Sequence, residues 1–323
     1  MDIKKLIPNW SELVFSKANY DGLNLKADIK KRISKEFDSL NISNSKMDGF
    51  CTEGLPKTSE TGSGLNYSTI FHKLVTKKNF SPALFLAQFT NDYLESNLDE
   101  KRLNGFLSRG LRTFASLIRE QDFANKLEIN LKKIDNSVKV LMDPEQDTKS
   151  HVDIKLIFKS KEFNLWTYQA SKNAIYPHTI ERVTGQRGEL ENGVHILCPI
   201  STELGNVLLN KRKSLNIQTE RLNKWKLDLK NKKTKKQIED HQNKINKKVE
   251  EIENIKVKIK EIESQTKYLD IINGWFLYSD NYISEISNMI INFNKQNVIN
   301  YENLNEDLLK AEKILRSVTF FKK

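Results

Sequence analysis

Acidic and polar side chains gather on two expected strands in the middle of the chain. The segment 151–171 (HVDIKLIFKSKEFNLWTYQAS) predicts two strands joined by a short polar turn. Asp153 lies on the first strand, and Gln169 and Ser171 lie two residues apart on the second. Because residues two apart on a strand share a face, Asp153 can act together with Lys155, and Gln169 with Ser171. A carboxylate beside such groups is typical of metal-dependent phosphodiester hydrolysis, in which a hard cation stabilises the extra negative charge on the phosphate.

The elements expected around these residues run in the order helix, three strands, short helix, strand. The helix covers residues 107–131, the strands 136–142, 151–159, 162–170 and 193–199, and the short helix 177–184. The long connection between the third and fourth strands favours a crossover and a mixed sheet. The long helix carries two acidic residues close together, Glu120 and its nearby competitor Asp122, in the segment LIREQDF.

This order, with Asp153 and the triplet Gln169-Ala170-Ser171, resembles the PD-(D/E)XK (restriction-endonuclease-like) superfamily over roughly residues 107–200. The resemblance implies an αβββαβ core in which Asp153 holds Mg²⁺ or Mn²⁺, with Glu120 and Gln169 as further ligands. It also implies that Lys155 or Lys172 positions the attacking water. Proteins of this general build resemble components of bacterial restriction and antiphage defence systems.

The sequence departs from the family pattern at both ends of the triplet. Gln169 stands where an acid is usual, and Ser171 stands where a lysine is usual. Lys155 is the preferred replacement, because Lys172 should point to the opposite face of a regular strand. Two alternatives stay open: an active Mg-dependent endonuclease, or a fold that has lost its chemistry and only binds. Each residue also has an interpretation without a catalytic role: Asp153 would be an ordinary strand residue, and Glu120 a solvated helix residue.

The net charge of the chain is +11, and most of it lies in one segment. Residues 211–260 contain 17 Lys and Arg against 7 Asp and Glu. This excess predicts binding to a polyanion, and we expect nucleic acid, above all DNA. A solvated lysine-rich helix is the alternative. The candidate contacts to phosphate are Lys211, Arg212, Lys213, Lys232, Lys233, Lys235 and Lys236, together with Arg182 and Arg187 before the last expected strand.

The same segment carries a heptad pattern. Ile238, Ile245, Ile252 and Ile259 recur every seven residues, which predicts a coiled coil of about four heptads, interrupted upstream near residues 230–237. A helical hairpin and a dimer would both bury this stripe, and the pattern does not decide between them. It also allows a second function of a different class, a non-catalytic interaction subunit that recruits a protein partner or another copy of itself.

Together these patterns predict an α+β protein. We expect a helical N-terminal region over 1–105, with helices at 68–76 and 83–98, a nuclease-like core over 106–205, a basic coiled-coil arm over 206–273 and C-terminal helices over 274–323. No run of about 18 apolar residues occurs, and the first residues lack the apolar core of a secretory signal. Cys51 and Cys198 do not make a disulfide framework, so we expect a cytoplasmic protein without a membrane partner.

Overall fold

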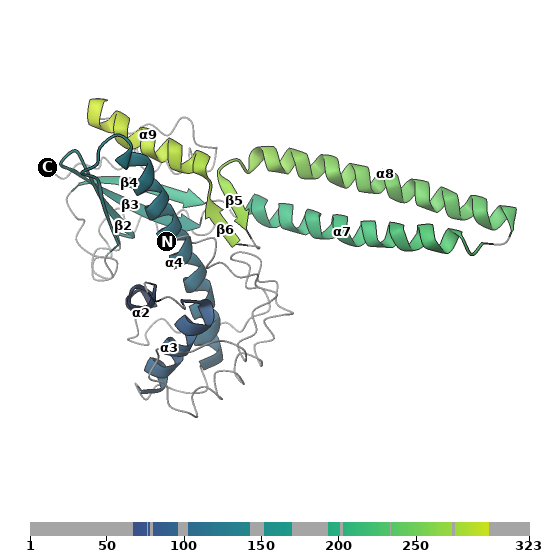
Figure 1. Ribbon diagram of the computed structural model, residues 1–323, viewed down its shortest axis with the longest axis horizontal. Coiled ribbons are helices and arrows are strands. Elements are labelled where there is room, and N and C mark those ends of the chain that lie inside the picture. The colour runs from purple at the N-terminus through teal and green to yellow at the C-terminus, as the bar shows by residue number, and fades with distance from the viewer. Residues whose placement is uncertain are drawn as a thin grey trace. The chain divides into compact units, whose positions relative to one another are not determined.

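The computed structural model describes residues 67–75, 77, 80–95, 103–142, 152–169, 193–200, 203–232, 234–272 and 275–296. These residues fall into two compact units. Glu203–Lys267 forms one of them, which we call the helical arm, and the remaining described residues form the main unit. Figure 1 shows both units, and each is described by itself below.

The main unit contains a mixed sheet of four strands in the order β1-β2-β3-β4. β1 pairs with β2 and β2 with β3 in antiparallel fashion, whereas β3 and β4 run parallel. The predicted mixed sheet is thereby confirmed, and the chain is an α+β protein. The strands are β1 (Lys139–Leu141), β2 (Ile154–Phe158), β3 (Lys161–Gln169) and β4 (Val194–Ile200).

β1 is shorter than the strand expected over 136–142. The carboxylate of Asp135 accepts hydrogen bonds from the backbone N–H of Ser137 at 2.9 Å and from its hydroxyl at 2.7 Å. Such local bonds hold the chain in a turn and compete with the sheet ladder. The strand therefore begins only at Lys139.

β2 and β3 are joined by a two-residue turn. Lys159 and Ser160 both adopt left-handed backbone conformations, with φ of 48° and 61°, and Phe158 pairs with Lys161 across the turn. Positive φ at both central residues matches the right-handed twist of the flanking strands. Neither residue is a glycine, so the turn is made at a conformational cost.

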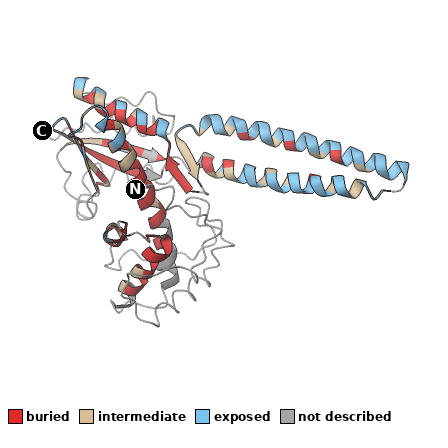
Figure 2. Ribbon diagram, viewed as in Figure 1, coloured by how far each residue is buried: buried red, intermediate tan, exposed pale blue. Residues whose placement is uncertain are grey.

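One face of the sheet carries Leu156, Phe163 and Cys198, all of them buried. Helix α9 (Asp280–Gln296) lies against this face, since the rings of Phe163 and Phe293 are 5.7 Å apart at an angle of 82°. The long helix α4 (Leu103–Lys132) confirms the helix predicted over 107–131. Figure 2 shows buried residues along α3 and α4, on β6 and on part of α9.

Two shorter helices, α2 (Tyr67–Leu74) and α3 (Pro82–Glu95), pack against α4. The hydroxyl of Ser81 accepts a hydrogen bond from the N–H of Leu84 at 3.1 Å, and Pro82 is the first helical residue. A serine cap followed by proline satisfies the first turn of a helix, which explains why α3 begins here. Edge-to-face contacts join the aromatic rings of Phe71, Phe80 and Phe114 into one cluster.

The sequence did not predict the second sheet. β5 (Leu269–Ile272) and β6 (Trp275–Tyr278) pair in antiparallel fashion, where we expected the end of the arm and the start of a helix. All four residues of β6 are buried, so this strand lacks the alternation that marks a half-exposed strand. A short apolar run without alternation cannot be told from a helix by its pattern, which explains the error.

The helical arm is an antiparallel hairpin of α7 (Glu203–Leu229) and α8 (Lys235–Gln265). Residues later in α7 contact residues earlier in α8, as expected for antiparallel helices. The contacts are Arg212 with Glu263, Gln218 with Lys248, and Trp225 with His241. The heptad residues Ile245 and Ile252 are buried against Leu222. The turn between the helices falls within 230–234, inside the predicted interruption, and Thr234 caps α8. Figure 1 shows the two helices side by side.

Candidate functional site

Asp153 lies in a bend directly before β2. Its Oδ2 atom accepts a hydrogen bond from the backbone N–H of Thr167, at 2.5 Å, and another from the hydroxyl of Thr167, at 3.1 Å. Thr167 is buried in β3, opposite Cys198 of β4. Two hydrogen bonds therefore hold the predicted catalytic carboxylate against β3, an inner strand of the sheet.

A buried arginine, Arg119, lies next to this sheet on α4. Its side chain is only 2% exposed, and its guanidinium carbon is 5.9 Å from the centre of the Tyr278 ring. The Nη2 atom of Arg119 donates to the hydroxyl of Ser116 at 3.1 Å. Burial lowers the pKa of Arg119 below its ordinary value, and interactions with Tyr278, Glu120 and Asp153 oppose this shift. The guanidinium thus shares its surroundings with both predicted carboxylates.

Tyr278 joins this arrangement from β6. Its hydroxyl donates a 2.6 Å hydrogen bond to the carbonyl oxygen of Cys198. Burial raises the pKa of Tyr278 well above its ordinary value, and Arg119 opposes the shift. Burial also raises the pKa of the Cys198 thiol, and the charge of Asp153 adds to the effect. We call Arg119, Glu120, Asp153, Cys198 and Tyr278, which interact electrostatically, the Arg119 cluster.

Glu120 enters this cluster through its own helix. Its Oε1 atom accepts a hydrogen bond from the hydroxyl of Ser116 at 2.9 Å, and Ser116 in turn accepts from Arg119. Its competitor Asp122 is buried and forms an ion pair with Lys126 at 2.9 Å. The structure thus brings Glu120 and Asp153 into one electrostatic environment, although they are 33 positions apart in the chain.

The resemblance implies Mg²⁺ or Mn²⁺ at this place. Within the described ranges, no three His, Cys, Asp or Glu side chains lie together in a way that could hold a metal ion. Asp153 and Glu120 share the cluster with a guanidinium, which supplies the kind of charge that a metal would bring. The described residues do not by themselves fit a divalent cation.

The predicted water-positioning lysine, Lys155, forms an ion pair with a residue of β3. The ammonium of Lys155 is 3.1 Å from Glu162 Oε2, and Lys155 pairs with Asn164 in the ladder. Alternation therefore places Lys155 on the sheet face opposite to Thr167. We had expected Lys155 to share a face with Asp153, but Asp153 lies in a bend, where strand alternation does not fix the direction of a side chain.

The other end of the predicted site is only partly described. Gln169 ends β3 opposite Ile200, and only its backbone is described. Lys172, Arg182, Arg187 and Lys233 lie outside the described residues. Their predicted roles as catalytic or phosphate-binding groups stay predictions.

The predicted phosphate contacts of the arm lie in three places. Lys211, Arg212 and Lys213 belong to α7, Lys232 follows it, and Lys235 and Lys236 open α8. Arg212 forms an ion pair with Glu263 of α8 at 2.7 Å, so it joins the two helices. The other five form no ion pair with any described residue and are at least partly exposed.

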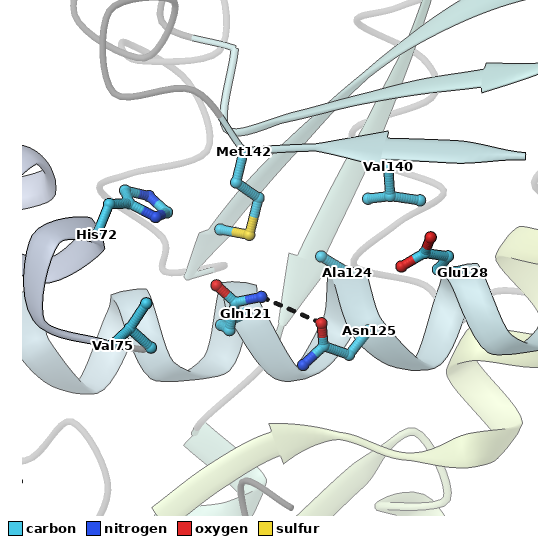
Figure 3. A pocket seen from close by; sticks show the side chains of 8 residues that line it. All are labelled: His72, Val75, Gln121, Ala124, Asn125, Glu128, Val140 and Met142. Carbon is cyan, nitrogen blue, oxygen red and sulfur yellow. Dashed lines mark hydrogen bonds between the residues drawn. The ribbon is translucent and has the colours of Figure 1, made fainter. Parts of the chain in front are cut away.

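A cavity of about 350 Å³ in the main unit lies between the end of α2, α4 and β1. Figure 3 shows Val140 and Met142 of the β1 segment facing Gln121 and Asn125 of α4. Gln121 donates to Asn125 at 3.1 Å, and Glu128, which also lines the cavity, pairs with Lys132 at 2.7 Å. These polar groups of α4 therefore bond within their own helix.

Sequence patterns missed Arg119, Thr167 and Tyr278. Arg119 and Asp122 lie on the buried side of α4, among residues such as Ile118 and Phe123. Charged residues within an apolar stripe are a signal that could have identified them, because burying a charge demands partners. Tyr278 offered no such signal, because its segment was expected to be helical.

Comparisons of the chain with protein-family models, with curated proteins and with solved structures find no match. The likeness to the nuclease superfamily therefore rests on the order of elements and on the residues named above. In the part of the chain that the structure describes, no helix combines the length and the apolar character needed to cross a bilayer.

Proposed function

We propose that this protein binds nucleic acid, DNA in the first place, through its helical arm, and that its main unit is a nuclease-like core. The observation that carries the proposal is the excess of basic side chains on an arm whose apolar seam is already filled. Residues 211–260 carry 17 basic and 7 acidic side chains, and Leu222, Ile245 and Ile252 are buried within the hairpin.

The filled seam weighs against the alternative function, an interaction subunit that recruits a partner helix through the heptad stripe. A coiled-coil partner would need these residues, yet they already pack against Leu215, Trp225 and Leu229 within the hairpin. Lysine is the most frequent solvent-exposed residue of the arm. Exposed lysines at this density attract phosphate and release its counterions, which supplies affinity without sequence readout.

A second candidate, metal-dependent cleavage of DNA, is favoured by a separate observation. Glu120 from the long helix and Asp153 beside the second strand belong to one cluster, next to a parallel pair of strands. The resemblance implies that these two carboxylates act together in cleavage, and we assign a role in restriction or antiphage defence to this candidate. Hydrolysis would require the segment that follows Gln169 to complete the site.

The Arg119 cluster supports binding more than hydrolysis. Asp153 holds the backbone and hydroxyl of Thr167, Glu120 holds Ser116, and Arg119 balances their charge. The positive charge of Arg119 favours the ionised form of both carboxylates, and both carboxylates already accept hydrogen bonds from protein groups. The carboxylates then position α4 and the sheet.

Two assays on the full chain separate these functions. Fluorescence anisotropy of labelled duplex DNA is expected to show binding that weakens steeply with salt, because phosphate contacts release counterions. Plasmid incubated with protein and Mg²⁺ or Mn²⁺ tests for nicking, with Asp153→Asn as the matched variant. Nicking that Asp153→Asn abolishes establishes the second candidate, whereas nicking that it leaves unchanged rejects the assigned site. Failure to bind DNA or RNA at low salt would contradict the proposal.

A further inference from the structure

The basic charge of the arm is unevenly distributed along its length. Residues 221–247, which we call the arm tip, contain ten Lys and Arg and three Asp and Glu. The two segments 203–220 and 248–267, which form the arm base, contain eight Lys and Arg and seven Asp and Glu. The tip therefore carries a net charge of +7 and the base only +1.

Ion pairs follow the same division. The described ion pairs of the arm lie in its base, where Arg212 contacts Glu263 and Lys256 contacts Glu253, both at 2.7 Å, and Lys248 contacts Glu251. Within the described part of the tip, no lysine or arginine forms an ion pair. The exposed basic residues there are Arg221, Lys224, Lys226, Lys230, Lys235, Lys236, Lys244 and Lys247.

The start of α8 adds to the concentration of charge. Thr234 caps this helix through a capping box with Gln237, and Lys235 and Lys236 follow in the first turn, which contains no acidic residue. Cations at a helix N-terminus oppose the helix dipole, so this placement costs stability. Folding alone gives no reason for these two lysines, whereas an external anion would be attracted by both the lysines and the helix end.

We propose that the arm tip is the phosphate-binding surface of the protein and contacts the backbone of duplex DNA, while the arm base serves to hold the hairpin together. This inference rests on the proposed function and narrows it to one surface. Lysine is a compact charge without a fixed donor geometry, so the contact is independent of sequence. An anionic membrane is disfavoured, because the large apolar residues exposed on the described tip are Leu227 and Ile238 alone.

The test compares two variants of the full chain that lose the same charge. The tip variant carries Lys224→Gln, Lys226→Gln, Lys235→Gln and Lys236→Gln. The base variant carries Lys211→Gln, Lys213→Gln, Lys258→Gln and Lys260→Gln. Glutamine has nearly the helix propensity of lysine, so both hairpins should form, which far-UV circular dichroism checks. Duplex DNA affinity is measured by anisotropy between about 50 and 200 mM salt.

In the tip variant we expect the slope of log affinity against log salt to shrink by about three to four, and affinity at the lowest salt to fall more than about tenfold. In the base variant the slope should change by less than about one. Lys→Arg at the four tip positions should keep the wild-type slope, which shows that charge, and not local structure, is responsible.

Other outcomes overturn the inference in distinguishable ways. Equal losses in both variants would mean that the whole arm attracts DNA diffusely. An unchanged tip variant would place the DNA contact outside the tip while leaving the proposed function intact. A wild-type protein that fails to bind DNA would contradict the proposed function itself. Binding to vesicles of phosphatidylserine and phosphatidylcholine that only the tip variant loses, with DNA binding unaffected, would assign the tip to a lipid surface.

Discussion

The carboxylate of Asp153 accepts hydrogen bonds from both the backbone N–H and the hydroxyl of Thr167. The ladder between β2 and β3 ends with the pair of Ile154 and Leu165, two residues before Thr167. No residue of β2 pairs with Thr167. The side chain of Asp153 therefore supplies the hydrogen-bond acceptor for the backbone N–H of Thr167. A residue in this position holds the sheet together whether or not it takes part in chemistry.

Replacing Asp153 separates these two roles. We expect Asp153→Ala to lower the free energy of unfolding by about 2 to 3 kcal/mol, because it leaves a buried N–H of Thr167 without its acceptor. Asp153→Asn keeps an acceptor oxygen and should lose roughly half as much. Urea unfolding measures both, and Thr167→Val, which removes only the hydroxyl, serves as the control. An Asp153→Ala protein as stable as wild type would leave the carboxylate without a structural role.

Stability should decline at alkaline pH because of Cys198 and Tyr278. Burial raises the pKa of both groups in the folded protein above their ordinary values of 9.0 and 10.0. The unfolded chain therefore loses these protons first, and the free energy of unfolding falls as the pH rises through and above those ordinary values. Below them the contribution is fully present. Arg119, whose pKa is lowered by burial, acts with the opposite sign.

Urea unfolding at a series of pH values from about 7 to 10 measures this decline, since unfolded thiols and phenols ionise in that range. The variants Cys198→Ala and Tyr278→Phe should each flatten the alkaline limb, at the cost of some stability at neutral pH. A double variant whose stability declines as steeply as that of the wild type would show that other groups are responsible.

The turn between β2 and β3 offers a stabilising substitution. Ser160 has a φ of 61°, a conformation that glycine adopts without strain. We expect Ser160→Gly to raise the free energy of unfolding by about 0.5 to 1 kcal/mol, after the larger chain entropy of glycine in the unfolded state is deducted. Ser160→Ala, which keeps the strain, should give no gain. A loss of stability in the glycine variant would contradict the turn geometry.

The seam of the arm can be tested with a matched pair of isoleucines. Ile252 is 5% exposed within the hairpin, whereas Ile238, of the same heptad series, is 44% exposed. We expect Ile252→Ala to lower the free energy of opening of the arm by about 2 to 4 kcal/mol, and Ile238→Ala to change it little. Hydrogen exchange of the amides of α7 and α8 measures the opening. Equal effects of the two substitutions would argue against a hairpin with this seam.

Alternation and periodicity predicted the elements that are half exposed. β2 alternates buried and partly exposed residues, and α4 carries a buried stripe, so both were identified close to their bounds. β6 is buried along its whole length, and its sequence WFLY therefore lacked the signal that distinguishes a strand from a helix. The heptad stripe predicted helices that bury it, and only the contacts between α7 and α8, such as Trp225 with His241, distinguish a hairpin from a dimer.

The candidate site was predictable only as far as single residues. Asp153 was identified by its type and position on a strand, and Glu120 by the resemblance to the nuclease superfamily; both interact electrostatically with Arg119. The buried Arg119 between α4 and Tyr278 depends on β6, which pattern analysis had assigned to a helix. The direction of the Asp153 side chain depends on a bend that no residue pattern predicts. Its pairing with Lys155 stays a prediction.

The main unit is assembled from chain segments on both sides of the arm. On the ribosome, β3 and β4 are therefore complete well before Tyr278 and Phe293, the residues that contact Cys198 and Phe163, have been made. The hairpin forms from neighbouring segments, so it can fold as soon as it emerges. The sheet face that carries Phe163 stays without α9 until that later helix has been synthesised. At this stage of its synthesis the nascent chain exposes apolar surface, which is what chaperones bind.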